Sequence, residues 1–375
     1  MEKKYLTTES VTEGHPDKLC DKIADAILDA CLTHDSNSRV ACEVLATKGN
    51  IIVAGEITCG IKLGIRNIVK DVLYSVGYNP SDFRIQVKVH QQSPDIADGV
   101  GRGIDTGAGD QGIMYGYATD ETPEYLPLPV VLANRITARL TEVYKNGTVK
   151  GIKPDGKSQV TIEYENGKPK RIKTIVVSVQ HDENKTLTDL THDIKKYVLF
   201  DACENFPFDS ETEILINPSG RFVLGGPAAD TGLTGRKLGV DTYGGLVSHG
   251  GGAFSGKDPT KVDRSGAYMC RYVAKNIVAA GLAKECLVSV AYAIGKPDPV
   301  MIDVDTKGTG KIPDRIIGNI IRNYFDFRPK GIIMELGLKS IYYSDFCNNC
   351  HFMHPDAPWE RIDSVGVISE KVEVK

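Results

Sequence analysis

The chain has 375 residues, of which 41% are hydrophobic and 25% charged, with a formal net charge of -4. This composition excludes a disordered polar chain. No apolar run approaches the roughly 18 residues of a membrane span. The net charge does not favour nucleic acid as a partner. At roughly 100 to 200 residues per domain, the length predicts two or three domains.

The N-terminal stretch MEKKYLTTESVTEGHPDK has no apolar segment after its lysines, so it does not have the pattern of a secretory signal. Nine cysteines are scattered along the chain, and most lie inside apolar patterns. An odd number of scattered, buried thiols is typical of a reducing compartment. We therefore expect a cytoplasmic location.

The first predicted elements are a helix, a hairpin, a second helix and a strand. Residues 16–35 space their apolar side chains by threes and fours, with Pro16 suited to the first helical position. Two extended apolar runs meet at Lys48–Gly49–Asn50, which predicts a hairpin. A second helical pattern ends near Gly77, and residues 83–90 alternate with period two.

The same order of elements returns twice. The second copy places its helix, hairpin, helix and strand at 127–147, 158–180, 186–200 and 212–218, with the hairpin turning at Asn166–Gly167. The third copy places them at 264–282, 285–306, 313–325 and 331–337. A period of about 120 residues is too long for a solenoid. It predicts an α+β fold of three similar units with pseudo-threefold symmetry, their sheets packed on a shared core.

The repeat divides the chain into 1–97, 98–224 and 225–375. Three Gly-rich or polar segments do not repeat: 12–17, 91–116 and 219–263. Function concentrates in loops on a rigid scaffold, so we expect the site there. The segment 91–112 has no apolar periodicity and is typical of a lid that excludes water.

The short segment EGHPDK places His15 and Asp17 at the first turn of a predicted helix. Unpaired N–H groups at that end favour a phosphate or carboxylate. Taken alone, the stretch is also consistent with Asp17 simply favouring the helix start and His15 lying at the surface.

The third polar segment combines glycines with the cations Arg221, Arg236, Lys237, Lys257, Lys261 and Arg264. Glycine lets the backbone approach a ligand, and Arg and Lys bind phosphate oxygens, so the segment predicts a polyphosphate site. A solvated loop is the alternative. Magnesium takes only one or two protein carboxylates along with phosphates, and several aspartates could supply them: Asp17, Asp155, Asp230, Asp258 and Asp263.

Gly251 to Lys257 spells the G-x-x-x-x-G-K of a P-loop, but Asp258 follows where that motif needs Ser or Thr. Pro259 also breaks the helix that a P-loop lysine opens. The match therefore indicates phosphate binding and not a P-loop fold. A phosphotransferase or ATPase could use this loop directly, and a catalytically silent regulatory subunit is a further alternative. The retained set of charges argues against the silent subunit.

The stretch CNNCHFMH groups Cys347, Cys350, His351 and His354. These residues could bind zinc or cycle a disulfide. No second ligand pair with suitable spacing exists, so a structural role is favoured.

Four stretches, ESVTEGHPDK, GAGDQGIMYGYATDET, TGRKLGVDTYGG and HGGGAFSGKDPTKVDRS, resemble motifs of the methionine adenosyltransferases (S-adenosylmethionine synthetases). The resemblance covers about residues 5 to 359 and departs from the family after Tyr343. It implies three α+β units and an enzyme in which the sulfur of methionine attacks C5′ of ATP and expels the triphosphate, which is then hydrolysed to phosphate and diphosphate. It also implies Mg²⁺ and K⁺ as cofactors, and a homodimer or homotetramer with active sites between subunits, without nucleic acid or membrane.

The resemblance further implies roles for single residues. His15, Lys157, Arg236 and Lys257 would be catalytic. The ATP pocket would add Asp110, Asp155, Arg221, Phe222, Asp230, Lys237 and Ala253. Methionine would contact Glu56, Gln92, Asp230 and Lys261, while Asp17 and Asp263 would bind Mg²⁺ and Glu43 would bind K⁺. The residue pattern alone makes Glu43 and Glu56 outward-facing strand residues, and the lid from Gln92 to about Gly109 matches the family's gating loop in position.

Overall fold

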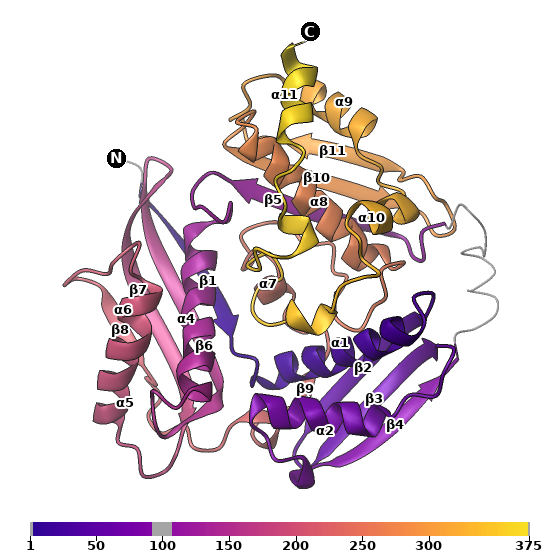
Figure 1. Cartoon of the computed structure of the whole chain (residues 1–375). Coiled ribbons are helices and arrows are strands. Elements are labelled where there is room, and N and C mark those ends of the chain that lie inside the picture. The colour runs from indigo at the N-terminus through magenta and orange to yellow at the C-terminus, as the bar shows by residue number, and fades with distance from the viewer. Residues whose placement is uncertain (1–2, 92–106, 374–375) are drawn as a thin grey trace.

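The computed structural model describes residues 3–91 and 107–373, and side chains as far as residue 370. It shows three sheets with their helices (Figure 1). Within these residues, no helix is both long and apolar enough to cross a membrane.

The first unit contains the predicted hairpin. Strands β2 (Arg39–Thr47) and β3 (Asn50–Thr58) pair antiparallel, and Gly49 takes a φ of 70° in the turn between them. β4 (Arg84–His90) runs parallel to β3. Helices α1 (Pro16–His34) and α2 (Ile65–Val76) bury one face of this sheet.

The second unit repeats this arrangement with longer strands. β6 (Ile152–Glu165) and β7 (Lys168–His181) join at Asn166 and Gly167, which have φ values of 51° and 77°. Two positive φ angles are typical of a type I′ turn, which confirms the predicted Asn-Gly hairpin. β8 (Glu213–Ile216) runs parallel to β7. α4 (Leu128–Lys145) covers the sheet, followed later by α5 (Leu187–Ile194), a π-helical turn (Lys195–Leu199) and α6 (Phe200–Ala202).

The third unit has a hairpin of β10 (Glu285–Tyr292) and β11 (Met301–Asp305), with α8 (Val262–Ala279) and α9 (Asp314–Tyr324). The short strand predicted at 331–337 is wrong, because α10 (Pro329–Glu335) occupies this stretch. Pro329 fits the first turn of a helix, and Ile332 and Leu336 are buried at helical spacing. A short apolar run does not distinguish a strand from a buried helix.

Each sheet is completed by a strand from elsewhere in the chain. β1 (Lys3–Val11) pairs with β6, β5 (Gly112–Thr119) pairs with β10, and β9 (Gly232–Leu233) pairs with β2, all antiparallel. Each of these strands precedes the first helix of one unit and joins the sheet of the next. The exchange is therefore cyclic, as pseudo-threefold symmetry requires. Each exchanged strand lies on one side of a predicted unit boundary, 97/98 or 224/225, and pairs with a sheet on the other side.

The sheets do not meet at a shared core as expected. Helices bury one face of each sheet, and the opposite faces carry exposed residues such as Glu43 and Lys157. The apolar core forms two clusters, one common to the first and third units and one within the second. The remaining helices are α7 (Leu238–Asp241) and α11 (Val365–Glu373), and single 3₁₀ turns occur at Pro80–Asp82, Gly226–Ala228, Tyr343–Asp345 and Pro358–Glu360.

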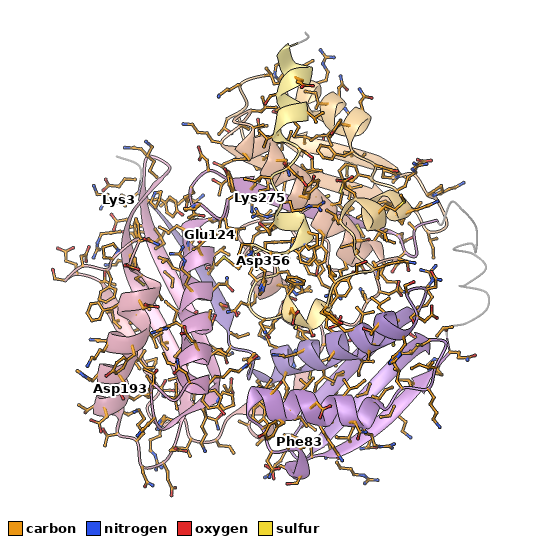
Figure 2. The ribbon with its side chains drawn as sticks, in the orientation of Figure 1. Lys3, Phe83, Glu124, Asp193, Lys275 and Asp356 are labelled. Carbon is orange, nitrogen blue, oxygen red and sulfur yellow. The ribbon has the colours of Figure 1, made fainter. Side chains whose placement is uncertain are left out.

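A segment near the C-terminus packs among the first helices of all three units (Figure 1). Tyr343 N donates to Asp29 of α1, Cys350 N donates to Asn134 of α4, and Tyr268 of α8 bonds to His351. Beside it, Arg271 of α8 donates to Glu360 and to backbone carbonyls of the loop before α4, including that of Glu124. Figure 2 labels Glu124 and Lys275 at this junction, where Lys275 also pairs with Glu360.

The close approach of α8 to β5 gives a stability prediction. A Cβ added at Gly116 would lie 2.0 Å from the Cys270 carbonyl carbon, which is backbone and cannot turn aside. We expect Gly116→Ala to lower the free energy of unfolding by about 1–3 kcal/mol. Gly366→Ala, at an open position of α11, is the control and should be neutral or slightly stabilising. Urea unfolding of both variants checks this, and equal midpoints would contradict it.

Candidate active site

Most of the predicted site residues that the structure describes gather in two groups. The first, the His15 group, comprises His15, Asp17, Arg236 and Lys237, with Lys157 beside them. The second, the Lys257 group, comprises Lys257, Lys261 and Asp263, with Glu43 beside them. Each group is built where a loop of the third unit meets an element of the first.

The turn before α1 holds His15 at the helix N-terminus. Thr12 donates its hydroxyl to the Pro154 carbonyl at 2.6 Å, and the Tyr78 hydroxyl donates to the Gly14 carbonyl at 2.6 Å. A Cβ on Gly14 would lie 2.4 Å from the Pro154 carbonyl oxygen, so only glycine allows this approach. The turn therefore sits between the first two units.

His15 caps α1 with its own ring. Its Nδ1 accepts the backbone N–H of Asp17 at 3.2 Å. Because Nδ1 is the acceptor, the proton of the neutral ring is on Nε2. Burial, helped by the charges of Lys237 and Lys157, lowers the pKa of His15 to about 3. His15 is therefore a neutral hydrogen-bond donor at physiological pH.

Asp17 is held by three neighbours. One oxygen accepts the N–H of Leu233 at 2.9 Å, and the other accepts from the ammonium of Lys237 at 2.5 Å. The guanidinium of Arg236 lies 3.8 Å away. Burial raises the pKa of Asp17, but the bonds from Lys237 and Leu233 outweigh it, and the net pKa is lowered. Asp17 is therefore a fixed anion.

The second unit adds further predicted residues to the His15 group. Asp155 is buried and accepts the N–H of Gly226 at 2.7 Å, and burial raises its pKa to about 6. Phe222 donates its N–H to His181 Nε2 at 3.1 Å. Lys157 is exposed on the open face of the sheet, and Arg221 and Asp230 are exposed on the adjoining loop. The charge of Lys157 acts on both His15 and Asp155, which links this part of the second unit to the His15 group.

The Lys257 group is attached to β2. Cys42 donates its N–H to the Gly256 carbonyl at 2.9 Å, and Ala41 forms an isolated bridge with Lys257. The ammonium of Lys257 donates to Asp263 at 2.6 Å. A Cβ on Gly252 would lie 2.2 Å from an oxygen of Asp263, so the Gly-rich stretch packs directly against this carboxylate.

Glu43 and Glu56 lie on the same open face of the first sheet. The register pairs Glu43 with Ala54 and Glu56 with Ala41. Burial raises the pKa of Glu43, with Lys257 acting to lower it and Glu56 to raise it. His90 Nε2 lies 3.1 Å from a Glu56 oxygen. The outward orientation expected from strand periodicity is therefore observed, beside Lys257.

Two residues of the polar segment have structural partners. Asp258 is fully buried and accepts from the backbone N–H of Val40 and from Thr260 and Lys261, so it does not fit the magnesium role considered for it. Arg264 is fully buried against Asp25 and is not free for phosphate. α8 begins at Val262 and not at Lys257, so the stretch is not a P-loop.

Three other predicted residues remain: Gln92, Asp110 and Ala253. Gln92, like most of the expected lid, lies outside the described residues. Asp110 is exposed and accepts the N–H of Gln111 at 2.7 Å. Ala253 lies against Gly235, in the space between the loops of the two groups.

The sequence reasoning missed the residues that hold these loops. Asp21, Asp25 and Asp29 are buried in α1, and their carboxylates accept backbone N–H groups of Gly235, Gly256 and Tyr343. Lys18 is also buried and donates to Asp241 at 2.6 Å. Aspartates at every fourth position of an otherwise amphipathic helix were the available signal, because this spacing places them on one face.

The donor set fits magnesium and not a structural zinc. Each of Asp17 and Asp263 offers a carboxylate that already holds a cation, the ammonium of a lysine. Magnesium binds through one or two carboxylates, with phosphates and water completing its shell. No group of three or more His, Cys, Asp or Glu side chains suited to a metal occurs among residues 3–91 and 107–373.

The Cys–His stretch is part of the interior. Cys347, Cys350 and His351 are fully buried, and burial raises the pKa of both thiols. The two thiols and His354 have separate partners. Cys350 donates to the Thr242 carbonyl, Cys347 donates to the Ser344 carbonyl, and His354 contacts the Asn348 carbonyl. These contacts support the structural role favoured from the sequence.

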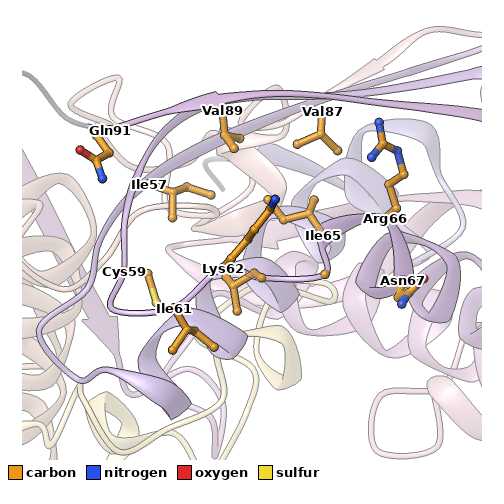
Figure 3. Close-up of a pocket in the computed structure, with 12 residues that line it drawn as sticks. Ile57, Cys59, Ile61, Lys62, Ile65, Arg66, Asn67, Val87, Val89 and Gln91 are labelled. Atoms are coloured by element: carbon orange, nitrogen blue, oxygen red, sulfur yellow. The ribbon is translucent and has the colours of Figure 1, made fainter.

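A pocket lies on the helix-covered face of the first sheet (Figure 3). It has a volume of about 580 Å³ and lies between Ile57, Val87 and Val89 of the first sheet and the loop that leads into α2. Glu56 and His90 alternate with these residues and therefore lie on the opposite face of the sheet. The pocket is not continuous with the charged site.

Comparison with known proteins covers the whole chain. Family models for the N-terminal, central and C-terminal domains of S-adenosylmethionine synthetase match residues 3–97, 105–222 and 224–361. Two proteins named S-adenosylmethionine synthase, from two strains of Staphylococcus epidermidis, are each 48% identical over 395 residues, covering 100% of this chain and 99% of the relative.

The neutral state of His15 gives a pH prediction. A histidine that binds its proton near pH 6.5 when unfolded but near pH 3 when folded costs stability as the pH falls between these values, by up to about 1.4 kcal/mol per pH unit. His15→Asn keeps a capping acceptor but cannot titrate. We expect the variant to lose less stability than the wild type between pH 6.5 and 4.5, measured by urea unfolding. Parallel pH profiles of the two proteins would count against a neutral His15.

Proposed function

The chain belongs to the S-adenosylmethionine synthetase family and has its methionine adenosyltransferase activity, and we propose that the His15 group and the Lys257 group are the two halves of the site for this reaction. The observation that carries the proposal is the pair of lysine–aspartate contacts, Lys237 with Asp17 at 2.5 Å and Lys257 with Asp263 at 2.6 Å. In each, an ammonium lies where a metal ion would meet the carboxylate.

A metal triphosphate can enter such a site by exchange of partners. Its phosphate oxygens would accept from Lys237 and Lys257, and the carboxylates of Asp17 and Asp263 would hold its metal ions. The family uses metal ions, and we assign Mg²⁺ to these two aspartates and K⁺ to Glu43. Magnesium, when bound, supplies charge neutralisation along the triphosphate.

The reaction forms a bond between the methionine sulfur and C5′ of ATP while the bond from C5′ to the triphosphate oxygen breaks. A thioether has no proton to lose, so no general base is needed at the sulfur. The negative charge grows on the leaving triphosphate, and the fixed cations Arg236, Lys237 and Lys257 stabilise it where it develops. Water then cleaves the triphosphate, held by the same cations, into phosphate and diphosphate.

His15 acts on the leaving oxygen as a neutral donor. Its Nδ1 is engaged by the Asp17 N–H, which leaves the Nε2–H to donate to the oxygen that departs from C5′. A neutral imidazole donates without giving up its proton, so the triphosphate leaves as an anion. Lys157, on the open face beside His15, holds the triphosphate from the second unit.

The other assignments follow from the surfaces around the two groups. Asp110, Asp155, Arg221, Phe222, Asp230 and Ala253 form the rest of the ATP pocket. Glu56, Gln92, Asp230 and Lys261 hold methionine, for which a carboxylate and an ammonium complement the substrate's amino and carboxyl groups. The unit boundaries 1–97, 98–224 and 225–375 and a cytoplasmic location belong to the same proposal; nine free thiols support the location.

Within one chain, the loops of the two groups touch where Ala253 lies against Gly235, but this contact does not join their charged residues. No hydrogen bond or ion pair in the described ranges joins the His15 group to the Lys257 group, and their loops are attached to α1 at Asp17 and Asp25, two turns or about 12 Å apart. Glu43, Glu56 and Lys157 lie on open sheet faces that a second chain could cover. We therefore assign one half of each site to each subunit of a homodimer, alone or within a tetramer.

The shared site predicts complementation. Asp17→Asn and Lys257→Met should each be nearly inactive as homodimers. When the two are co-expressed, a mixed dimer has one site with both defects and one with neither, so the mixed dimer should have about half of the wild-type activity. Purification through two different tags isolates the mixed dimer. Absence of any recovery would place both halves in one chain.

The leaving-group site predicts a specific loss in Lys257→Met. Synthesis of S-adenosylmethionine, measured by mass spectrometry, should fall about 100- to 1,000-fold, because one fixed charge at the triphosphate is removed. Lys185→Met is the matched control, since Lys185 forms a partly buried pair with Asp193 at 2.8 Å outside the site. It should retain activity. Full-rate release of phosphate from ATP without methionine would instead favour a direct ATPase.

A further inference from the structure

Four aspartates of α1 form a buried row. Asp17, Asp21, Asp25 and Asp29 follow one another at every fourth position, and each is at most 6% exposed. Each accepts at least one backbone N–H from the C-terminal half of the chain, at distances of 2.6 to 2.9 Å; the donors are Leu233, Gly235, Gly256, Tyr343 and Ser344. The row attaches three separate segments to one helix.

Asp25 also binds a guanidinium through both of its oxygens. Arg264 donates to its two oxygens from NH1 and NH2, at 2.7 and 2.8 Å, and neither residue is exposed. The same NH1 donates to the Lys257 carbonyl at 3.2 Å, and Nε donates to the Tyr268 hydroxyl at 3.0 Å. Every branch of this guanidinium is engaged.

The neighbours of this pair in the chain are the residues of the Lys257 group. Gly256, which donates to Asp25, precedes Lys257, and Arg264 follows Asp263. The two ends of the stretch from 256 to 264 are therefore attached to one carboxylate. The contact between Lys257 and Asp263, at 2.6 Å, closes the same loop on its other side.

We propose that Asp25 and Arg264 are positioning residues for the transferase reaction, which set where Lys257 and Asp263 stand relative to each other and to α1. The inference rests on the proposed function of the Lys257 group. Neither residue touches substrate, because both are fully buried. A buried ion pair often adds little net stability compared with apolar residues of the same size, so geometry is the advantage that this pair offers.

Small displacements of charged groups around a reacting centre are costly, and a shift of 1 Å can reduce the rate about 100-fold. Asp25→Asn keeps the shape of the side chain and an acceptor for Gly256, but it leaves the Arg264 charge without its counterion. We expect kcat to fall about 10- to 100-fold. Arg264→Lys keeps a positive charge but has no two-pronged donor, and it should lose kcat to a similar or smaller extent.

Asp29→Asn is the matched control. Asp29 belongs to the same row and is also buried, but its partners are Tyr343 and Ser344, away from the loops of the site. Burial raises its pKa to about 6. We expect Asp29→Asn to lower the urea midpoint while kcat, per folded protein, stays within about twofold of wild type.

A double-mutant cycle separates positioning from general stability. If Asp25 acts through Lys257, Asp25→Asn should add less than about a threefold loss of kcat in a Lys257→Met background, but its full loss in an Arg236→Met background. A merely structural role would give the same loss in both. Product formation at saturating ATP, methionine and magnesium, with the folded fraction measured by urea unfolding, gives each value.

The outcomes are distinct. Equal losses in the two backgrounds, or wild-type kcat in both Asp25→Asn and Arg264→Lys, would overturn the positioning role while leaving the proposed function in place. Wild-type kcat in Lys257→Met would instead refute the assignment of the site itself. If Asp25→Asn does not fold, the same cycle built on Arg264→Lys decides the question.

Discussion

The carboxylates buried along α1 are the constraint on which the site depends. A buried carboxylate must be hydrogen-bonded or paired, so each aspartate of the row fixes the backbone of the segment that satisfies it. Asp17 and Asp21 hold the loop of Arg236 and Lys237, while Asp25 holds the stretch with Lys257 and Asp263. Two Gly-rich loops without regular structure thereby acquire defined positions on a rigid helix.

The exchange of strands between units serves the same end. β1 belongs by sequence to the first unit but completes the sheet of the second, so the turn that follows it, with Gly14 and His15, lies where the two units meet. β9 likewise joins the first sheet just before the loop of Arg236. Residues far apart in the chain come together because each unit supplies an edge strand to the next.

The positive charges of the two loops lie close together because each is balanced by a nearby aspartate. Lys237 and Lys257 are each neutralised by one aspartate, and Lys261 by the buried Asp258. Arg264 is balanced by Asp25 inside the protein. At the proposed site, a metal-bound triphosphate would replace the first two pairings without leaving either partner alone, as stabilisation of a leaving group requires.

The sequence by itself determined the repeat of helix, hairpin and helix, the Asn166–Gly167 turn and the concentration of glycines and cations in one segment, because periodicity and turn chemistry are local. It could not show that Arg264 and Asp258 have partners in the interior, because the same types of side chain also occur at exposed binding sites. Only the tertiary structure decided these, through burial and the backbone N–H groups that reach each carboxylate. It also decided that residues 331–337 form a helix and that the sheets turn one face outward, since both depend on packing partners far away in the chain.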